Sequence, residues 1–150
     1  MFREDKKKVQ DYWQEEIYPR QNSITSNNGF YCLFEISEEE RSLKNKTWLP
    51  ALDYSSAGNK LYEGLATIYT TEDSNGNVIQ CGECLASGED GFISLTKKST
   101  DELVWLIVLS TTNPFDRIEL HDDFFHATSS IGIKVTIPAE RPDKLTIQWK

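Results

Sequence analysis

Two histidines lie close together in the sequence, with two aspartates between them. In His121-Asp122-Asp123-Phe124-Phe125-His126, imidazoles and carboxylates are near enough along the chain to ligate one metal ion. The same residues suit a general base whose ring is oriented by a carboxylate. Asp122 and Asp123 equally suit a hairpin turn, in which aspartate side chains accept hydrogen bonds from nearby backbone amides. The segment therefore predicts a turn that brings the two histidines together. Metal binding or general-base catalysis by these side chains is the alternative interpretation.

A second pair of reactive side chains has C-x-x-C spacing, in Cys81-Gly82-Glu83-Cys84. A structural zinc site needs four ligands, and Cys32 with a histidine would complete the set at a spacing that matches no zinc finger or ribbon. A redox pair normally lies at a helix N-terminus. This pair falls inside a predicted strand, where an offset of three places the sulfurs on opposite faces. We therefore expect buried structural thiols, with no bound metal or cofactor.

Familiar catalytic motifs are missing from the sequence. It contains no G-x-S-x-G nucleophile elbow, no phosphate-binding Walker loop, no G-x-G-x-x-G dinucleotide motif and no H-E-x-x-H metalloprotease motif. We therefore expect a protein that is not an enzyme and that carries no cofactor.

The charge of the chain is negative and unevenly distributed. The net charge is −8, and the segment from Asp53 to Leu95 holds seven acidic residues against one basic residue, Lys60. A negative field repels phosphates, which argues against a nucleic-acid-binding surface along this segment. The same field attracts a basic protein partner and accelerates their encounter, although acidity also serves simple solubility.

The sequence predicts no contact with membranes. Its longest apolar run, Leu103 to Leu109, is far shorter than the roughly 20 residues that a membrane helix needs. The charged N-terminal residues are followed by no apolar stretch, which argues against a secretory signal. The odd number of cysteines fits a reducing compartment. We expect a cytoplasmic protein.

The elements that must position these side chains are organised around the run 103–111. This run is apolar at both odd and even positions, as expected of a central strand that is covered on both faces. An amphipathic helix is predicted over residues 4–18, with an apolar stripe that includes Val9, Trp13 and Ile17. A Ser37-x-x-Glu40 capping box predicts a short helix over 38–44.

The remainder of the chain reads mainly as strands. Asp73-Ser74-Asn75-Gly76-Asn77 separates two strand patterns, 61–71 and 78–86, and so predicts a hairpin. Gly88 to Gly91 predicts the next turn, and further strands follow to residue 149. The chain is therefore predicted to be a single domain, 1–150, with an α+β fold. In that fold the N-terminal helix packs on a large, curved, mainly antiparallel β-sheet, a meander of about seven or eight strands.

The acidic hairpin residues and the segment Asn113-Pro114-Phe115-Asp116-Arg117-Ile118-Glu119-Leu120 carry a resemblance. The whole chain resembles the small acidic immunity proteins that bacteria encode beside contact-dependent growth inhibition systems and other polymorphic toxins. The resemblance implies a cytoplasmic inhibitor without catalysis that binds one cognate basic toxin domain, often a nuclease, and blocks its active site. Because such proteins are diverse, the resemblance assigns no individual residue.

Carboxylates on stiff hairpins could imitate phosphates and form charge-assisted hydrogen bonds with arginine and lysine of a basic partner. A minority of the residues in any interface supplies most of the binding energy, so we expect about a third of the candidates to matter. The candidates for partner contacts are Glu72, Asp73, Glu83, Glu89, Asp90, Asp116, Asp122 and Asp123.

Two alternative functions make different structural demands. A small hydrolase-like or metal-dependent enzyme using His121 or His126 requires a pocket in which an imidazole meets a carboxylate. A small-ligand-binding or structural subunit requires a cavity in the curved sheet, lined by Trp105 and its neighbours.

Overall fold

The central apolar run forms a strand in the middle of the sheet, as predicted. In the computed structural model, which describes residues 1–149, strand β9 (Leu103–Leu109) lies between β2 (Ser23–Ser26) and β8 (Ser87–Lys97). Side chains alternate along β9. Ile107 faces one hydrophobic core, and Leu106 and Val108 face another. Both faces of this strand are therefore covered, which is why the run is apolar at both parities.

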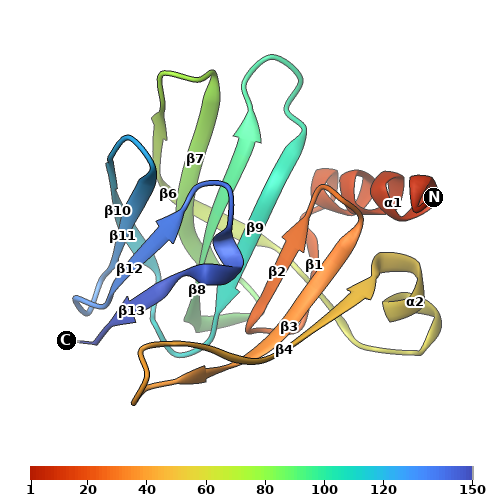
Figure 1. Ribbon diagram of the computed structural model, residues 1–150, viewed down its shortest axis with the longest axis horizontal. Helices are drawn as coiled ribbons and strands as arrows, with labels where there is room; N and C mark the ends of the chain where they lie inside the picture. Colours follow the sequence, from red (N-terminus) through yellow and green to blue (C-terminus); the bar gives the residue numbers. More distant parts are fainter. Residues whose placement is uncertain (150) are drawn as a thin grey trace.

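The main sheet is antiparallel and strongly curved (Figure 1). Within residues 1–149 it has eleven strands in the order β10-β11-β12-β13-β4-β3-β2-β9-β8-β7-β6. The edge strand β10 packs against β6 and β7, which leaves the sheet nearly closed on itself. The strands not yet given are β3 (Phe30–Ser37), β4 (Ser42–Pro50), β6 (Leu65–Glu72), β7 (Asn77–Cys84), β10 (Phe115–Leu120), β11 (Phe124–Ser129), β12 (Lys134–Pro138) and β13 (Thr146–Gln148).

Two hydrophobic cores lie on opposite faces of this sheet. The inner core fills the concave side and joins residues of the central strands to residues of β10–β13, among them Phe125 and Val135. The outer core, which includes Val9 and Tyr54, lies beneath helix α1 (Arg3–Gln14) and helix α2 (Ala51–Ser56). A small two-stranded sheet, β1 (Ile17–Pro19) with β5 (Leu61–Glu63), lies beside these helices. The short 3₁₀ helix η1 (Pro142–Lys144) connects β12 to β13.

The N-terminal helix is shorter than the predicted 4–18. It ends at Gln14, and Glu16 follows with a left-handed backbone at φ 57°, which a continuing helix does not permit. Ile17 then begins β1 and pairs with Glu63. Val9 is buried as the apolar stripe predicted, whereas Ile17 belongs to a strand.

Two other local predictions are wrong. Residues 38–41 form a turn that leads into β4 in place of the predicted helix 38–44. Ser37 Oγ accepts a hydrogen bond from the Glu40 amide as a capping box requires, but Arg41 adopts φ 57° and ends the turn. The predicted turn at 88–91 lies within β8, where a Cβ on Gly91 would come within 2.6 Å of the Phe115 ring. Glycine is needed there for close packing and not for a turn.

The strands missing from the predicted meander lack a hydrophobic pattern. Strand β2 has the sequence Ser-Ile-Thr-Ser and is buried despite its polar side chains, and most of β4 is exposed. Neither produces the alternation on which strand prediction depends. No helix within the described residues combines the length and apolarity needed to cross a lipid bilayer.

Candidate functional site

A cleft opens at one end of the curved sheet. Its volume is about 920 Å³, and its walls come from the β6–β7 turn, the β10–β11 turn, the β2–β3 turn and the loop that follows β12. Figure 1 shows the β6–β7 and β10–β11 turns at the same edge of the sheet. Segments that are far apart in the sequence therefore converge on one site, and the predicted hairpin at 73–77 supplies part of its rim.

The floor of the cleft is apolar and buried. Leu95, Trp105 and Phe125 line it and are each nearly fully buried. The indole Nε1 of Trp105 donates a hydrogen bond to the carbonyl of Ala139 at 3.0 Å, which holds the loop after β12 against the floor. Trp105 is thus among the residues that line the cleft, which is the arrangement that the ligand-binding alternative requires. An apolar floor with a polar rim is the usual composition of a binding site.

Acidic side chains dominate the rim of this cleft. Asp73, Asp122, Asp123 and Glu140 line it, together with the basic residues Lys97 and Arg141. Among the described residues, Asp122, Asp123 and Glu140 form no ion pair. Three of the eight predicted contact residues, Asp73, Asp122 and Asp123, thus lie around one cleft, and none of the three forms an ion pair within the described residues.

Asp73 has a structural task at the same rim. Its carboxylate accepts hydrogen bonds from the amides of Asn75 and Asn77 and from the Asn77 side chain. Burial opposes the charge, but these hydrogen bonds outweigh it and lower the pKa of the Asp73 carboxyl. Asp73 therefore stays ionised while it holds the β6–β7 turn in shape.

The other predicted contact residues lie away from the cleft. Glu72 pairs with Lys98 at 3.1 Å. Glu83, Glu89 and Asp90 surround the opposite end of β7, and Asp116 is exposed near the start of β10. Asp90 is buried and accepts a hydrogen bond from the Thr111 amide.

Burial also raises the pKa of the Asp90 carboxyl, an effect that its hydrogen bonds from Thr111 and Gln21 oppose. A group that is buried and already bonded to its own chain has little left to offer a partner. The acidic residues do not form one continuous surface.

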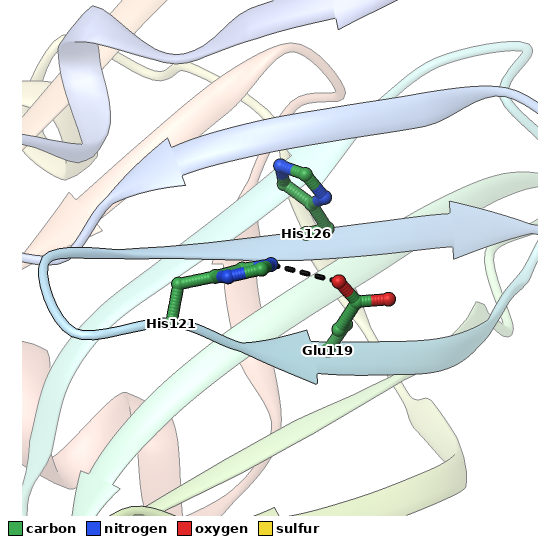
Figure 2. A group of neighbouring side chains, drawn as sticks. All are labelled: Glu119, His121 and His126. Carbon is green, nitrogen blue, oxygen red and sulfur yellow. Dashed lines mark hydrogen bonds and ion pairs between the residues drawn. The ribbon is translucent and has the colours of Figure 1, made fainter.

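A second cluster of functional groups lies on the β10–β11 hairpin. Glu119 on β10 is directly opposite His126 on β11, and His121 follows Glu119 by two positions. Figure 2 shows the three side chains on the same side of the hairpin, with a contact of 2.8 Å between His121 Nε2 and Glu119 Oε1. The neighbouring residues Phe125 and Ala127 point into the inner core, so the cluster lies on the outer face.

Aromatic packing holds both imidazoles. The Phe124 ring stacks on His121 with centroids 4.5 Å apart and lies 5.1 Å from His126. Burial lowers the pKa of His126, and Lys134 and His121 lower it further while Glu119 opposes them. His126 is therefore neutral at pH 7, which leaves a ring nitrogen available to accept a proton or a metal ion.

The turn between the histidines is confirmed, and it brings the rings to 4.8 Å between centroids. His121 also borders the cleft, whereas the residues that line the cleft do not include His126. Sequence reasoning missed Glu119. Its signal was the Glu-x-His spacing, which places both side chains on one face of a strand that enters the turn.

The cysteines are placed as predicted. Cys81 lies in the inner core and Cys84 in the outer core, on opposite faces of β7. Burial raises the pKa of each of these thiols to about 12 and that of Cys32 to about 11. At neutral pH all three are protonated, and a protonated thiol is a poor nucleophile and metal ligand.

The chain matches no known family model, no curated protein and no solved structure. Its function is therefore inferred from its own residues.

Proposed function

We propose that this protein is a non-catalytic binding module, of the kind represented by bacterial immunity proteins, that engages a basic partner domain through the cleft at the end of its sheet. The observation that carries the proposal is the rim of the cleft, where Asp122, Asp123 and Glu140 have no ion-pair partner among the described residues. Carboxylates left unpaired beside an apolar floor are suited to arginine and lysine side chains of a partner.

The electrostatics favour fast association. A net charge of −8 attracts a basic domain over a distance of about a Debye length, and the turn-borne carboxylates then supply specific contacts. Asp122 and Asp123 lie on a tight turn whose Asp123 carbonyl accepts a hydrogen bond from the Ala139 amide. This hydrogen bond ties the backbone of the turn to the loop after β12, which reduces the conformational entropy that the turn loses when a partner binds. In this proposal the protein acts in the cytoplasm and inhibits a cognate toxin domain, such as a nuclease, by covering its basic substrate site.

The test uses the protein encoded by the adjacent gene as the binding partner. The variant Asp122→Asn/Asp123→Asn keeps residues that suit the turn and removes two charges from the cleft. The control variant Glu89→Gln/Asp116→Asn removes two exposed charges elsewhere. We expect the cleft variant to weaken binding by about tenfold or more and the control by no more than about threefold.

Association rates measured from low to physiological salt provide the second readout. A steep fall of the on-rate with salt is expected for wild type, and a shallower fall for the cleft variant. Equal losses of affinity in the cleft and control variants would mean that the acidic residues act only through the net charge of the protein. A larger loss in the control would move the interface to the opposite end of the sheet, and both outcomes contradict binding at the cleft.

A second candidate function is a small hydrolytic enzyme. The observation in its favour is the contact between His121 and Glu119 at the border of the cleft, which is the arrangement of a general base and its orienting carboxylate. Turnover of a substrate that disappears in His121→Ala, with folding retained, would favour this candidate over the binding module.

A further inference from the structure

The register of the β10–β11 hairpin places three metal-ligating side chains on one patch of its outer face. Glu119 and His126 are a cross-strand pair, and His121 lies two positions after Glu119, on the same side of the chain (Figure 2). Their ligand atoms, one carboxylate oxygen and two imidazole nitrogens, all lie within 4.8 Å of one another. This patch adjoins the cleft through His121, but none of its three ligands is a carboxylate of the cleft rim, and it is not needed for the proposed function.

We propose that Glu119, His121 and His126 form a binding site for a divalent transition-metal ion, with zinc as the best fit. Two imidazoles and one carboxylate form a ligand set that zinc accepts, whereas calcium and magnesium are bound by oxygen ligands. Tetrahedral coordination at the usual Zn–N and Zn–O lengths places donors about 3.3 Å apart. That separation lies between the two distances seen here. His121 Nε2 is 2.8 Å from Glu119 Oε1, and all three ligand atoms lie within 4.8 Å of one another.

Aromatic packing restricts the two imidazole rings of the site. Phe124 contacts both imidazole rings and limits their movement. The Nδ1 atom of His126 is buried and has no hydrogen-bond partner within the described residues. No hydrogen bond through this atom therefore fixes the orientation of the His126 ring.

Three protein ligands from one hairpin leave a fourth position of the ion open. Glu119 and His121 are exposed, so this position faces solvent and can take a water molecule. An open site of this kind binds zinc less tightly than a closed structural site with four protein ligands, and we expect a micromolar dissociation constant.

Zinc binding to the purified full chain tests the proposal by isothermal titration calorimetry. Wild type should bind one zinc ion, and magnesium chloride at the same concentration should give no heat. His126→Ala, His121→Ala and Glu119→Gln should each weaken binding at least tenfold. Asp116→Asn, a control that removes an exposed carboxylate from the same hairpin, should change it less than twofold.

Cobalt substitution separates this site from the cysteines. Cobalt bound by imidazole and carboxylate gives ligand-field bands without the thiolate charge-transfer absorption that a cysteine ligand would add. Circular dichroism verifies that each variant is folded, and the melting temperature of wild type should rise with zinc while that of His126→Ala should not. Dissociation constants above about 1 mM for wild type, or equal affinity in wild type and His126→Ala, would refute the site.

Discussion

Two regions of the main sheet differ in how many of their faces are covered. Strands β2, β8 and β9, the two-sided region, are buried on the concave side by the inner core and on the other side by the outer core. Strands β10–β13, the one-sided region, bury one face in the inner core and leave the other accessible, as the burial of alternate residues in β11 and β12 shows.

The number of covered faces determines whether polar side chains are accessible to a ligand. In and beside the two-sided region, two buried carboxylates bind their own chain: Asp90 accepts a hydrogen bond from the Thr111 amide, and Asp5 accepts one from the Leu52 amide. In the one-sided region, Glu119, His121 and His126 lie on the accessible face and have spare ligand atoms. The part of the sheet that is buried on both faces thus supports the part that is available to ligands, and the three following substitutions test that division.

The largest expected effect is in the centre of the two-sided region. Ile107→Ala removes a fully buried side chain of β9 and leaves a cavity that packed neighbours cannot fill. We expect the free energy of unfolding to fall by about 2 to 5 kcal/mol, measured by urea denaturation. Ile131→Ala is the matched control, because Ile131 is 41% exposed beside the one-sided region, and its effect should stay within about 0.5 kcal/mol. Similar losses in both variants would remove the distinction between the regions.

An intermediate effect is expected at the helix layer that covers the outer core. Asp5 of α1 is 8% exposed, and its carboxylate accepts a hydrogen bond of 2.9 Å from the amide of Leu52 in the first turn of α2. Asp5→Ala leaves that amide without its cap and should cost about 1 to 2 kcal/mol of unfolding free energy. Glu4→Ala, an exposed neighbour on the same helix, should cost less than about 0.5 kcal/mol. Equal thermal shifts in the two variants would mean that the bond between the helices contributes nothing.

The smallest effect, and one that depends on pH, is expected at Asp143 in the one-sided region. Two hydrogen bonds from the Arg141 guanidinium, at 3.0 and 3.1 Å, lower the pKa of the Asp143 carboxyl against the opposing effect of burial. Because the folded pKa lies below the unfolded value of about 3.9, Asp143 contributes stability above about pH 4 and loses it as the pH falls through the folded pKa.

Asp143→Asn should therefore be less stable than wild type at pH 7, and the two proteins should converge in strong acid. Chemical denaturation across this range measures the difference. Asp116→Asn provides the comparison, since Asp116 is exposed and forms no ion pair among the described residues. A constant difference for Asp143→Asn would show that its ionisation does not contribute to stability.

The same division explains which parts of the fold the sequence could predict. Strand β9 was predictable because burial on both faces made it apolar throughout, and the β6–β7 hairpin because Asn75-Gly76 suits a tight turn. Strand β4 was not predictable, because exposed polar side chains form a strand there through backbone pairing with β3. The capping pattern at Ser37 made the predicted hydrogen bond, but a single hydrogen bond does not distinguish a turn from the start of a helix.

The candidate site was predictable in its residue types and not in its geometry. The pair His121 and His126 was evident, and so was the turn between them. The convergence of Asp73, Asp122 and Glu140 on one cleft depends on the curvature of the sheet, which no local pattern encodes. Glu119 was missed because its role follows from the register of β10 against β11, and one shifted residue would have turned it toward the core.

The position of β2 has a consequence for the kinetics of folding. This strand pairs with β3 on one side and with β9 on the other, and the side-chain oxygen of Asn22 accepts a hydrogen bond from the amide of Ser110, 88 positions away. Because these two segments lie far apart in the sequence, a long loop must close, at a cost in conformational entropy, before they form any stabilising contact. Folding of such a topology takes milliseconds to seconds. Until β9 pairs with β2, the backbone N–H and C=O groups along that edge of β2 are unpaired and can pair with another chain. Aggregation during refolding should therefore increase steeply with protein concentration.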